Sequence, residues 1–354
     1  MGKKRTGGNP RLEVKKLDRE ILKLANQRAK AWLDFAQSAD YERIEMHGAA
    51  EQLTAAIVSS NPGPLSESAV TALFRELCSG CQALVKKVRI AFLGPEQSYS
   101  YLAALQQFGS GPELIPLTTI EAVFEEVSRG NADFGVVPLE NSTDGRIADT
   151  LTMFVKTPLK ICGEIPFAVH HCLLAKGERT QIKQICSKPQ ALSQCRGWIA
   201  KHFPLVQQVP VESTSAAAKS ASKDESVAAI ASEQAAAVYG LSLIARNIED
   251  NATNVTRFAV IGQEAAKRTG KDKTALMFEI LHQPGSLADV LNVFKRAKLN
   301  MTWIESFPMP NLPNEYLFFV EIEGHQLDAR IRKALNLLET KTARLVILGS
   351  YPGK

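Results

Sequence analysis

Short apolar segments alternate with helix-like segments between Val88 and Gly262, and this alternation constrains the fold more than any other feature of the sequence. Apolar runs such as VRIAFLG, DFGVVPL and TRFAVIG have the length of buried strands. The intervening segments SYSYLAALQQF and IEAVFEEVSRG have helical spacing, and Thr118 with Glu121 has the spacing of a capping box for the second. The pattern predicts an α/β domain with a largely parallel sheet, whose ligand site lies in the loops beyond the strand ends.

Two different patterns flank this region. Residues 9–87 predict helices: Asn9-Pro10 suits a helix start, a second helix is expected over 41–58, and Ser66 suits the cap of a third. The polar, lysine-rich run 264–273 predicts a linker. Strands and helices after it follow a β-α-β-β-α-β order, which is ferredoxin-like. The 354-residue chain is therefore expected to form three domains: an all-α part over 1–87, an α/β part over 88–265 and an α+β part over 273–354.

Composition excludes several classes of protein. Apolar residues make up 45% of the chain and charged residues 22%, as in a globular protein. The net charge of +5 is spread along the chain without a basic block, so we expect no nucleic-acid partner. No apolar stretch is long enough to span a membrane. The spacing of the six cysteines is not that of a disulfide framework, which favours reduced thiols and a cytoplasmic location.

Two motifs have simple structural interpretations. Cys78 and Cys81 lie three residues apart on a predicted helix, and no second pair of metal ligands follows them. Core thiols are therefore favoured over a metal or redox site. His170 and His171 lie within an apolar run, where strand alternation buries at least one ring. A buried histidine with satisfied hydrogen bonds is favoured there over a metal ligand.

Polar residues gather where strands meet loops. The loop Gly94–Ser100 links a strand to a helix start, which suits an anion or, alternatively, a simple helix cap. Asn141 follows the strand DFGVVPL, and later junctions carry Ser187, with Gln194 on the helix after it, and Glu212. Thr256-Arg257 instead begins a strand, which we expect to return from a second lobe to the first and to face a crevice between them. Such convergence predicts a polar small-molecule site.

The segments GPEQSYS, PLENS, SKPQALSQC, ESTSAAA and NVTRF occur in the order found in prephenate dehydratases, and residues 88–262 resemble that family. The resemblance implies a two-lobed catalytic domain like that of periplasmic binding proteins. It also implies conversion of prephenate to phenylpyruvate, carbon dioxide and water without a metal or organic cofactor. Gln97 and Lys188 stand where the family usually has glycine and histidine.

The resemblance also implies roles for individual residues. Thr256 would act on the leaving hydroxyl, with Glu212 as the acid if burial keeps it protonated. Asn141 and Gln194 would orient the ring and keto group, and Arg257 would hold a carboxylate. The remaining residues expected to bind substrate are Ser98, Ser100, Ser187 and Phe258.

The C-terminal part resembles the ACT regulatory domain. Its segments Gly285-Ser286-Leu287 and Glu305-Ser306 stand where the family binds phenylalanine, which implies an allosteric effector. Phe307 replaces the arginine that usually follows.

The N-terminal part resembles the chorismate mutase domain of bacterial P-proteins and includes Arg11 and Arg28. Its helices interlock in the family, which implies a homodimer or homotetramer. Apolar or small residues replace polar groups of the mutase site, at Ala39, at Gly48 or Ala49, and at Val85. Losing one preorganised donor costs about 10²–10³ in rate, so we expect a weak or silent mutase.

Three alternatives stay open. A solute-binding protein would share the two-lobed build without turning its ligand over. A bifunctional enzyme would also convert chorismate to prephenate. The amino analogue arogenate, finally, could replace prephenate as the substrate, which would make the chain an arogenate dehydratase.

Overall fold

The computed structural model describes residues 10–37, 54, 56–143, 145–281, 283–308 and 316–353. Within it the chain divides into two compact units, one comprising Met1–Val88 with Phe108–Pro112 and the other Arg89–Gln107 with Glu113–Lys354. Asn9 and most of the helix expected over 41–58 lie outside the described residues. In the described part, no helix is long and apolar enough to cross a membrane.

The first unit is helical. Its long helices are α1 (Pro10–Ala36) and α4 (Glu67–Val85). Ser66 caps α4 as predicted, because its side chain accepts a hydrogen bond from the backbone N–H of Ala69 at 3.2 Å. The guanidinium of Arg28 on α1 lies 3.1 Å from the sulfur of Cys78 and 3.1 Å from that of Cys81. Both thiols are buried, as expected for core cysteines.

The first lobe of the second unit is built on a sheet with the strand order β2-β1-β3-β11-β5, to which β4 adds beside β3. Its strands are β1 (Arg89–Leu93), β2 (Glu113–Leu117), β3 (Phe134–Asn141), β4 (Gly145–Arg146), β5 (Lys160–Ala168) and β11 (Val255–Gly262). Its helices are α5 (Tyr99–Phe108), α6 (Ile120–Ser128) and α7 (Ala148–Lys156). Thr119 caps α6 by accepting from the N–H of Ala122 at 3.1 Å, so the cap predicted at Thr118 was misplaced by one residue.

The prediction of a largely parallel sheet fails at the strand that carries Thr256. Strand β1 is parallel to β2 and β3, whereas β11 is antiparallel to both of its neighbours, β3 and β5. The reason is topological. Strand β11 enters the sheet from the second lobe rather than through a helical crossover, so it runs in the opposite direction.

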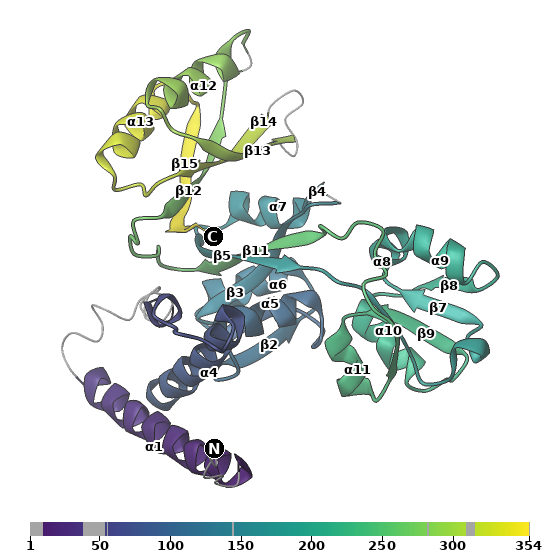
Figure 1. The fold of residues 1–354 in the computed structure, drawn as a ribbon. Helices are drawn as coiled ribbons and strands as arrows, with labels where there is room; N and C mark the ends of the chain where they lie inside the picture. Colours follow the sequence, from purple (N-terminus) through teal and green to yellow (C-terminus); the bar gives the residue numbers. More distant parts are fainter. Residues whose placement is uncertain are drawn as a thin grey trace, which may run out of the picture. The chain divides into compact units, whose positions relative to one another are not determined.

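The second lobe has a sheet of its own, with the order β10-β6-β9-β7-β8. Its strands are β6 (Cys172–Ala175), β7 (Gln184–Ser187), β8 (Gln207–Pro210), β9 (Val227–Ala231) and β10 (Ser242–Ala245), and its helices are η1 (Arg179–Gln181), α8 (Pro189–Gln194), α9 (Arg196–His202), α10 (Thr214–Ala221) and α11 (Glu233–Tyr239). The apolar run expected to form one strand is divided between β5 and β6. The chain therefore crosses to the second lobe at residues 169–171, and its predicted return to the first lobe at β11 is confirmed (Figure 1).

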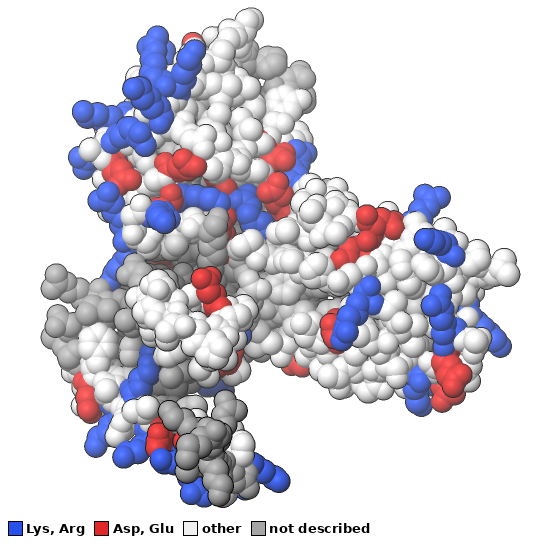
Figure 2. Space-filling model, viewed as in Figure 1, with Lys and Arg blue, Asp and Glu red and all other residues white. Residues whose placement is uncertain are grey.

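The C-terminal part follows the predicted order. It comprises β12 (Asp272–Glu279), α12 (Ser286–Arg296), β13 (Met301–Pro308), β14 (Tyr316–Glu323), α13 (Ala329–Glu339) and β15 (Arg344–Pro352). The antiparallel sheet has the order β13-β14-β12-β15, and α12 and α13 cover one of its faces. Basic side chains gather over these two helices on the face drawn in Figure 2, whereas both signs are mixed on the second lobe.

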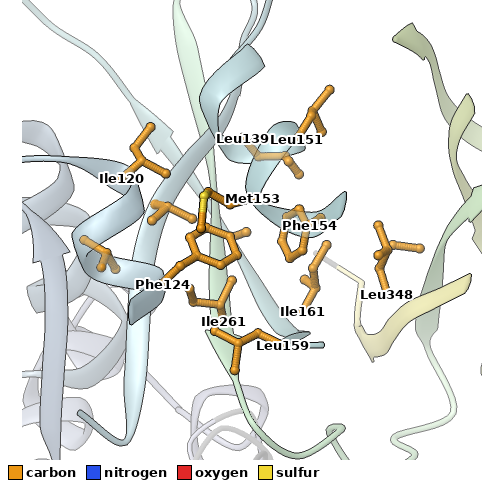
Figure 3. Close-up of a cluster of buried hydrophobic side chains, with 14 of the residues drawn as sticks. Ile120, Phe124, Leu139, Leu151, Met153, Phe154, Leu159, Ile161, Ile261 and Leu348 are labelled. Atoms are coloured by element: carbon orange, nitrogen blue, oxygen red, sulfur yellow. The ribbon is translucent and has the colours of Figure 1, made fainter. Parts of the chain in front are cut away.

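The opposite face of this C-terminal sheet shares a core with the first lobe. Phe124 and Phe154 from α6 and α7 meet edge to face with centroids 5.2 Å apart, and Leu348 of β15 belongs to the same cluster (Figure 3). At Gly349 the backbone approaches so closely that a Cβ would lie 2.1 Å from the carbonyl oxygen of Ile161. The two parts are therefore packed against each other rather than tethered.

A buried ion cluster joins the same two parts. Arg257 of β11 forms ion pairs with Glu140, Glu164 and Glu321, the last of which lies on β14. Burial acts to lower the pKa of Arg257, but the charge and hydrogen bond of Glu321, together with the charges of Tyr351 and Glu140, outweigh it, and the pKa is raised. Three further side chains complete the cluster: Lys273 at 2.6 Å from Glu164, Tyr351 whose hydroxyl donates to Glu321 at 2.6 Å, and Trp303 whose ring lies 5.1 Å from the guanidinium of Arg257.

Replacing Tyr351 with phenylalanine tests this cluster. The change removes one hydroxyl and leaves an oxygen of the buried Glu321 carboxylate without its donor, so we expect a loss of about 1–3 kcal/mol in the free energy of unfolding. Urea denaturation measures the loss. Tyr316→Phe on the exposed end of the same sheet is the matched control, and a Tyr351 variant as stable as this control would contradict the expectation.

Candidate functional site

Thr256 lies near the start of β11, which is paired on both sides within the first-lobe sheet. It pairs with Asn141 on β3 and with Phe167 on β5. The side-chain amide of Asn141 donates a hydrogen bond to Thr256 Oγ1 at 2.8 Å, and both side chains are buried. Thr256 Oγ1 thus acts as an acceptor. Among the residues that the structure describes, none accepts the hydrogen of this hydroxyl, which leaves it available to a ligand.

The hydrogen bonds around Thr256 continue into the second lobe. Asn141 Nδ2 also donates to Asn254 Oδ1 at 2.9 Å, and Asn254 Nδ2 donates to Gln194 Oε1 at 3.0 Å. Gln194 is the last residue of α8 in the second lobe. Predicted site residues from both lobes, Asn141, Gln194 and Thr256, are therefore brought together, and Asn254 is the residue that connects them.

Arg257 faces away from this group. Successive side chains of a strand point to opposite faces of a sheet, so Arg257 lies on the face opposite Thr256. There its guanidinium is occupied by the three carboxylates of the ion cluster. The structure does not bring Arg257 together with Thr256, and its charge is already balanced within the fold.

Aromatic rings lie beside the Thr256 group. Phe258 is buried and meets the ring of Phe167 edge to face, with centroids 6.5 Å apart. Phe167 in turn lies 6.1 Å from the ring of Tyr99. Phe258 thus belongs to an aromatic cluster next to the predicted catalytic threonine.

The loop after β1 forms a capped helix start. Ser98 Oγ accepts from the N–H of Tyr101 at 3.3 Å and donates to the carbonyl of Leu93 at 3.1 Å, and Ser100 is buried on α5. Gln97 adopts a left-handed backbone conformation with φ of 64°. A glutamine therefore takes the conformation that a glycine adopts without a steric penalty.

The polar residues predicted at strand ends of the second lobe differ in burial and in hydrogen bonding. Ser187 Oγ donates to the carbonyl of Ile230 at 2.6 Å, so its hydrogen is used within the lobe. Ser213 caps α10 by accepting from the N–H of Ala216 at 3.0 Å. Ser215 Oγ is buried and has no hydrogen-bond partner in the described part of the chain. Glu212 is exposed, so the burial that its predicted role requires is not found.

The segments expected to bind an effector contact the first lobe. Arg146 of β4 forms an ion pair with Glu305 at 3.1 Å and donates to the backbone carbonyl of Ser306 at 2.6 Å. In the antiparallel pairing of β3 with β4, Arg146 lies opposite Glu140, which is the neighbour of Asn141 on β3.

The other residues of these two segments lie at the start of a helix or in the hydrophobic core. Gly285 precedes α12 with φ of 90°, Ser286 begins that helix, and Leu287 packs against the core beneath it. Phe307 is buried against Phe319, with centroids 6.2 Å apart, so it serves as a core residue where the resembling family has arginine.

In the helical unit, Arg11 lies exposed on α1, and Val85 is the last residue of α4. Arg28 lies against the two thiols of α4 and over the ring of Trp32, 5.8 Å from its centroid. Ala39, Gly48 and Ala49 lie outside the described residues.

The sequence reasoning missed several residues of the network. Asn254 lies two positions before Thr256, so strand alternation places both on one face and could have identified it. Arg146 and Tyr99 had no comparable signal, because their contacts join segments that are far apart in the chain.

Comparison with known proteins identifies the family of this chain. Residues 90–266 match the family model described as Prephenate dehydratase. A bifunctional chorismate mutase/prephenate dehydratase of Aquifex aeolicus is 39% identical over 349 residues, covering 97% of this chain and 96% of that protein. A bifunctional chorismate mutase/prephenate dehydratase of Stutzerimonas stutzeri is 38% identical, and the match covers 97% of this chain and 96% of that protein.

The solved structure of a prephenate dehydratase from Arthrobacter aurescens in complex with L-Phe is 33% identical, with a TM-score of 0.70 over 75% of this chain and 90% of that one. Because the relatives from Aquifex aeolicus and Stutzerimonas stutzeri match nearly the whole length of the chain, and the family model spans the two-lobed part, the chain belongs to the prephenate dehydratase family.

Proposed function

We propose that Thr256 is the group that acts on the leaving hydroxyl when this chain converts prephenate to phenylpyruvate. The observation that carries the proposal is the hydrogen bond from Asn141 Nδ2 to Thr256 Oγ1. Since the oxygen already accepts a hydrogen bond from the protein, the hydroxyl hydrogen is directed outward as a donor. Donation to the departing hydroxide lowers the barrier to its loss, while aromatisation of the ring drives the loss of carbon dioxide.

The two carboxylates of the substrate need donors other than Arg257, whose guanidinium is already neutralised. We infer that they bind at the N-termini of α5 and α10, one helix from each lobe. Such ends present unpaired backbone N–H groups and a partial positive charge. The buried, unpartnered hydroxyl of Ser215 in the first turn of α10 supports this assignment. The same arrangement would hold prephenate between the lobes, with its ring near Phe258.

Two variants of Thr256 test the catalytic role. Thr256→Val keeps the shape of the side chain and removes the donor, so kcat for prephenate should fall about 10²–10⁴-fold with little change in KM. Thr256→Ser is the control, because it keeps the hydroxyl and the acceptor for Asn141. Phenylpyruvate absorbance measures both rates, and a valine variant with wild-type kcat would remove Thr256 from the chemistry.

We infer further that the C-terminal part is an ACT domain through which phenylalanine inhibits the enzyme. Its β-α-β-β-α-β order and the Arthrobacter aurescens relative solved with L-Phe support this inference. The contacts of Arg146 with Glu305 and Ser306 supply a route to the site, because β4 continues from the strand that ends in Asn141.

Phenylalanine titration of two arginine variants tests this route. Arg146→Gln removes the ion pair with Glu305, so the coupling between phenylalanine binding and dehydratase rate should weaken about fivefold or more. Arg129→Gln, which breaks an exposed ion pair within the first lobe, should be inhibited like the wild type. Equal inhibition of the Arg146 variant and the wild type would argue against the route.

For the helical unit we propose weak mutase activity and a role in pairing with a second copy of the chain. Val85 ends α4 without a polar group, and Arg28 lies against thiols and an indole. The alternative, an active mutase, is favoured by the names of the full-length relatives.

Pairing of two copies of the chain is supported by α1, which has no buried residue and exposes apolar side chains along its length: Leu12, Val14, Leu17, Ile21, Leu22 and Leu24. A homodimer or homotetramer would cover them.

Offering chorismate and prephenate separately decides between these alternatives. With chorismate as the only substrate, we expect phenylpyruvate to form at least about 10²-fold more slowly than from prephenate, as for the loss of one preorganised donor. Comparable rates would show an active mutase. Arogenate offered in a third assay shows whether the amino analogue is accepted, and absence of turnover with prephenate would favour a solute-binding protein instead.

A further inference from the structure

Hydrogen bonds around the Thr256 site continue beyond Gln194 to a buried histidine that has no part in the proposed chemistry. His171 Nε2 lies 2.9 Å from Gln194 Oε1, and the hydroxyl of Tyr99 lies 2.9 Å from His171 Nδ1. His171 is 2% exposed and lies where the chain crosses from the first sheet to the second. Its two ring nitrogens therefore connect a helix of the first lobe with a helix of the second.

One backbone amide fixes the direction of the hydrogen bonds that run from Asn141 to His171 Nε2. The N–H of Thr143 donates to Asn141 Oδ1 at 2.9 Å, so the amide nitrogen of Asn141 must be the donor toward Asn254 Oδ1. Asn254 Nδ2 is then the donor toward Gln194 Oε1. Gln194 Oε1 is consequently an acceptor, and His171 Nε2 must carry a hydrogen to bond with it.

Tyr99 secures the other side of the ring. Its hydroxyl lies 2.9 Å from His171 Nδ1 and also 2.9 Å from the carbonyl oxygen of His170. With a neutral imidazole it donates to Nδ1. With a charged imidazole it accepts from Nδ1 and donates to the carbonyl. The ring is therefore held at both nitrogens in either protonation state. The N–H of His171 also donates to Glu249 at 2.9 Å, which fixes the backbone.

We propose that His171 is a positioning residue for the dehydration reaction. Its Nε2–H orients Gln194, and through Asn254 and Asn141 it holds Thr256 Oγ1 as an acceptor with its hydrogen directed toward substrate. This inference rests on the proposed role of Thr256. A histidine that only filled the core would not need a donor directed at the side chain of Gln194.

Two substitutions of His171 distinguish the roles of its two ring nitrogens. His171→Gln places an amide N–H near the position of Nε2 and keeps a donor for Gln194. His171→Asn keeps a polar group near Nδ1 and withdraws that donor. A misplacement of about 1 Å costs up to 10²-fold in rate, so we expect kcat for prephenate to fall about tenfold or more in the asparagine variant. The glutamine variant should stay within about threefold of the wild type, and KM should change little in both.

His170→Gln is the matched control. His170 is exposed, and its ring bonds to Glu249 at 2.8 Å instead of joining the network, so wild-type kinetics are expected. A double variant, His171→Asn with Gln194→Ala, should lose less than the product of the two single losses in kcat, because both changes act through one contact. Wild-type kcat in His171→Asn, equal impairment of the asparagine and glutamine variants, or full additivity would each overturn the proposal.

A measurement on the unmodified protein covers the case in which the asparagine variant does not fold. Long-range ¹H–¹⁵N spectra of histidine-labelled enzyme should show His171 with a hydrogen on Nε2. A ring protonated only on Nδ1 would overturn the proposal, because Gln194 would then lack its donor. Failure of Thr256→Val to lower kcat would instead count against the proposed chemistry, so the two results are distinguishable.

Discussion

The catalytic part of this molecule depends on the antiparallel course of one strand. Strand β11 comes back from the second lobe and inserts between β3 and β5, and adjacent residues at its start face opposite sides of the sheet. Thr256 faces Asn141 and the amides behind it, whereas Arg257 faces the carboxylates that tie the first lobe to the C-terminal sheet. A shift of this strand along its axis would disturb both groups at once.

The two faces use polar chemistry in different ways. On the Arg257 face, opposite charges compensate one another within a buried cluster, and breaking such a cluster by removing one partner is costly. On the Thr256 face the groups are side-chain amides, a hydroxyl and an imidazole, and the hydrogen bonds from the amides to one another and to the hydroxyl have a fixed direction. The order of these hydrogen bonds makes the oxygen of Thr256 an acceptor.

Much of this arrangement could be predicted from the sequence. The alternation of elements, the return of β11 and the convergence of Asn141, Gln194 and Thr256 are all local or family-level signals. The direction of β11 and the role of Arg257 could not be predicted in the same way. The direction of β11 depends on its entry from the second lobe. The role of Arg257 depends on Glu321, which lies 64 residues further along the chain, and on a face of the sheet that only the packed C-terminal part defines. Glu212 was misjudged for a similar reason, since its exposure is a property of the lobe and not of the motif around it.

The core shared by the first lobe and the C-terminal sheet has an evolutionary consequence. Leu348 and Tyr351 are buried in one cluster with Phe154 and Ile161, and Gly349 leaves no space for a side chain at the junction. Deleting the last domain would thus remove part of the apolar core of the first lobe and expose a hydrophobic surface that favours aggregation. Loss of the last domain as a module is consequently a costlier evolutionary step than point changes within it, because the first lobe would lose part of its own core.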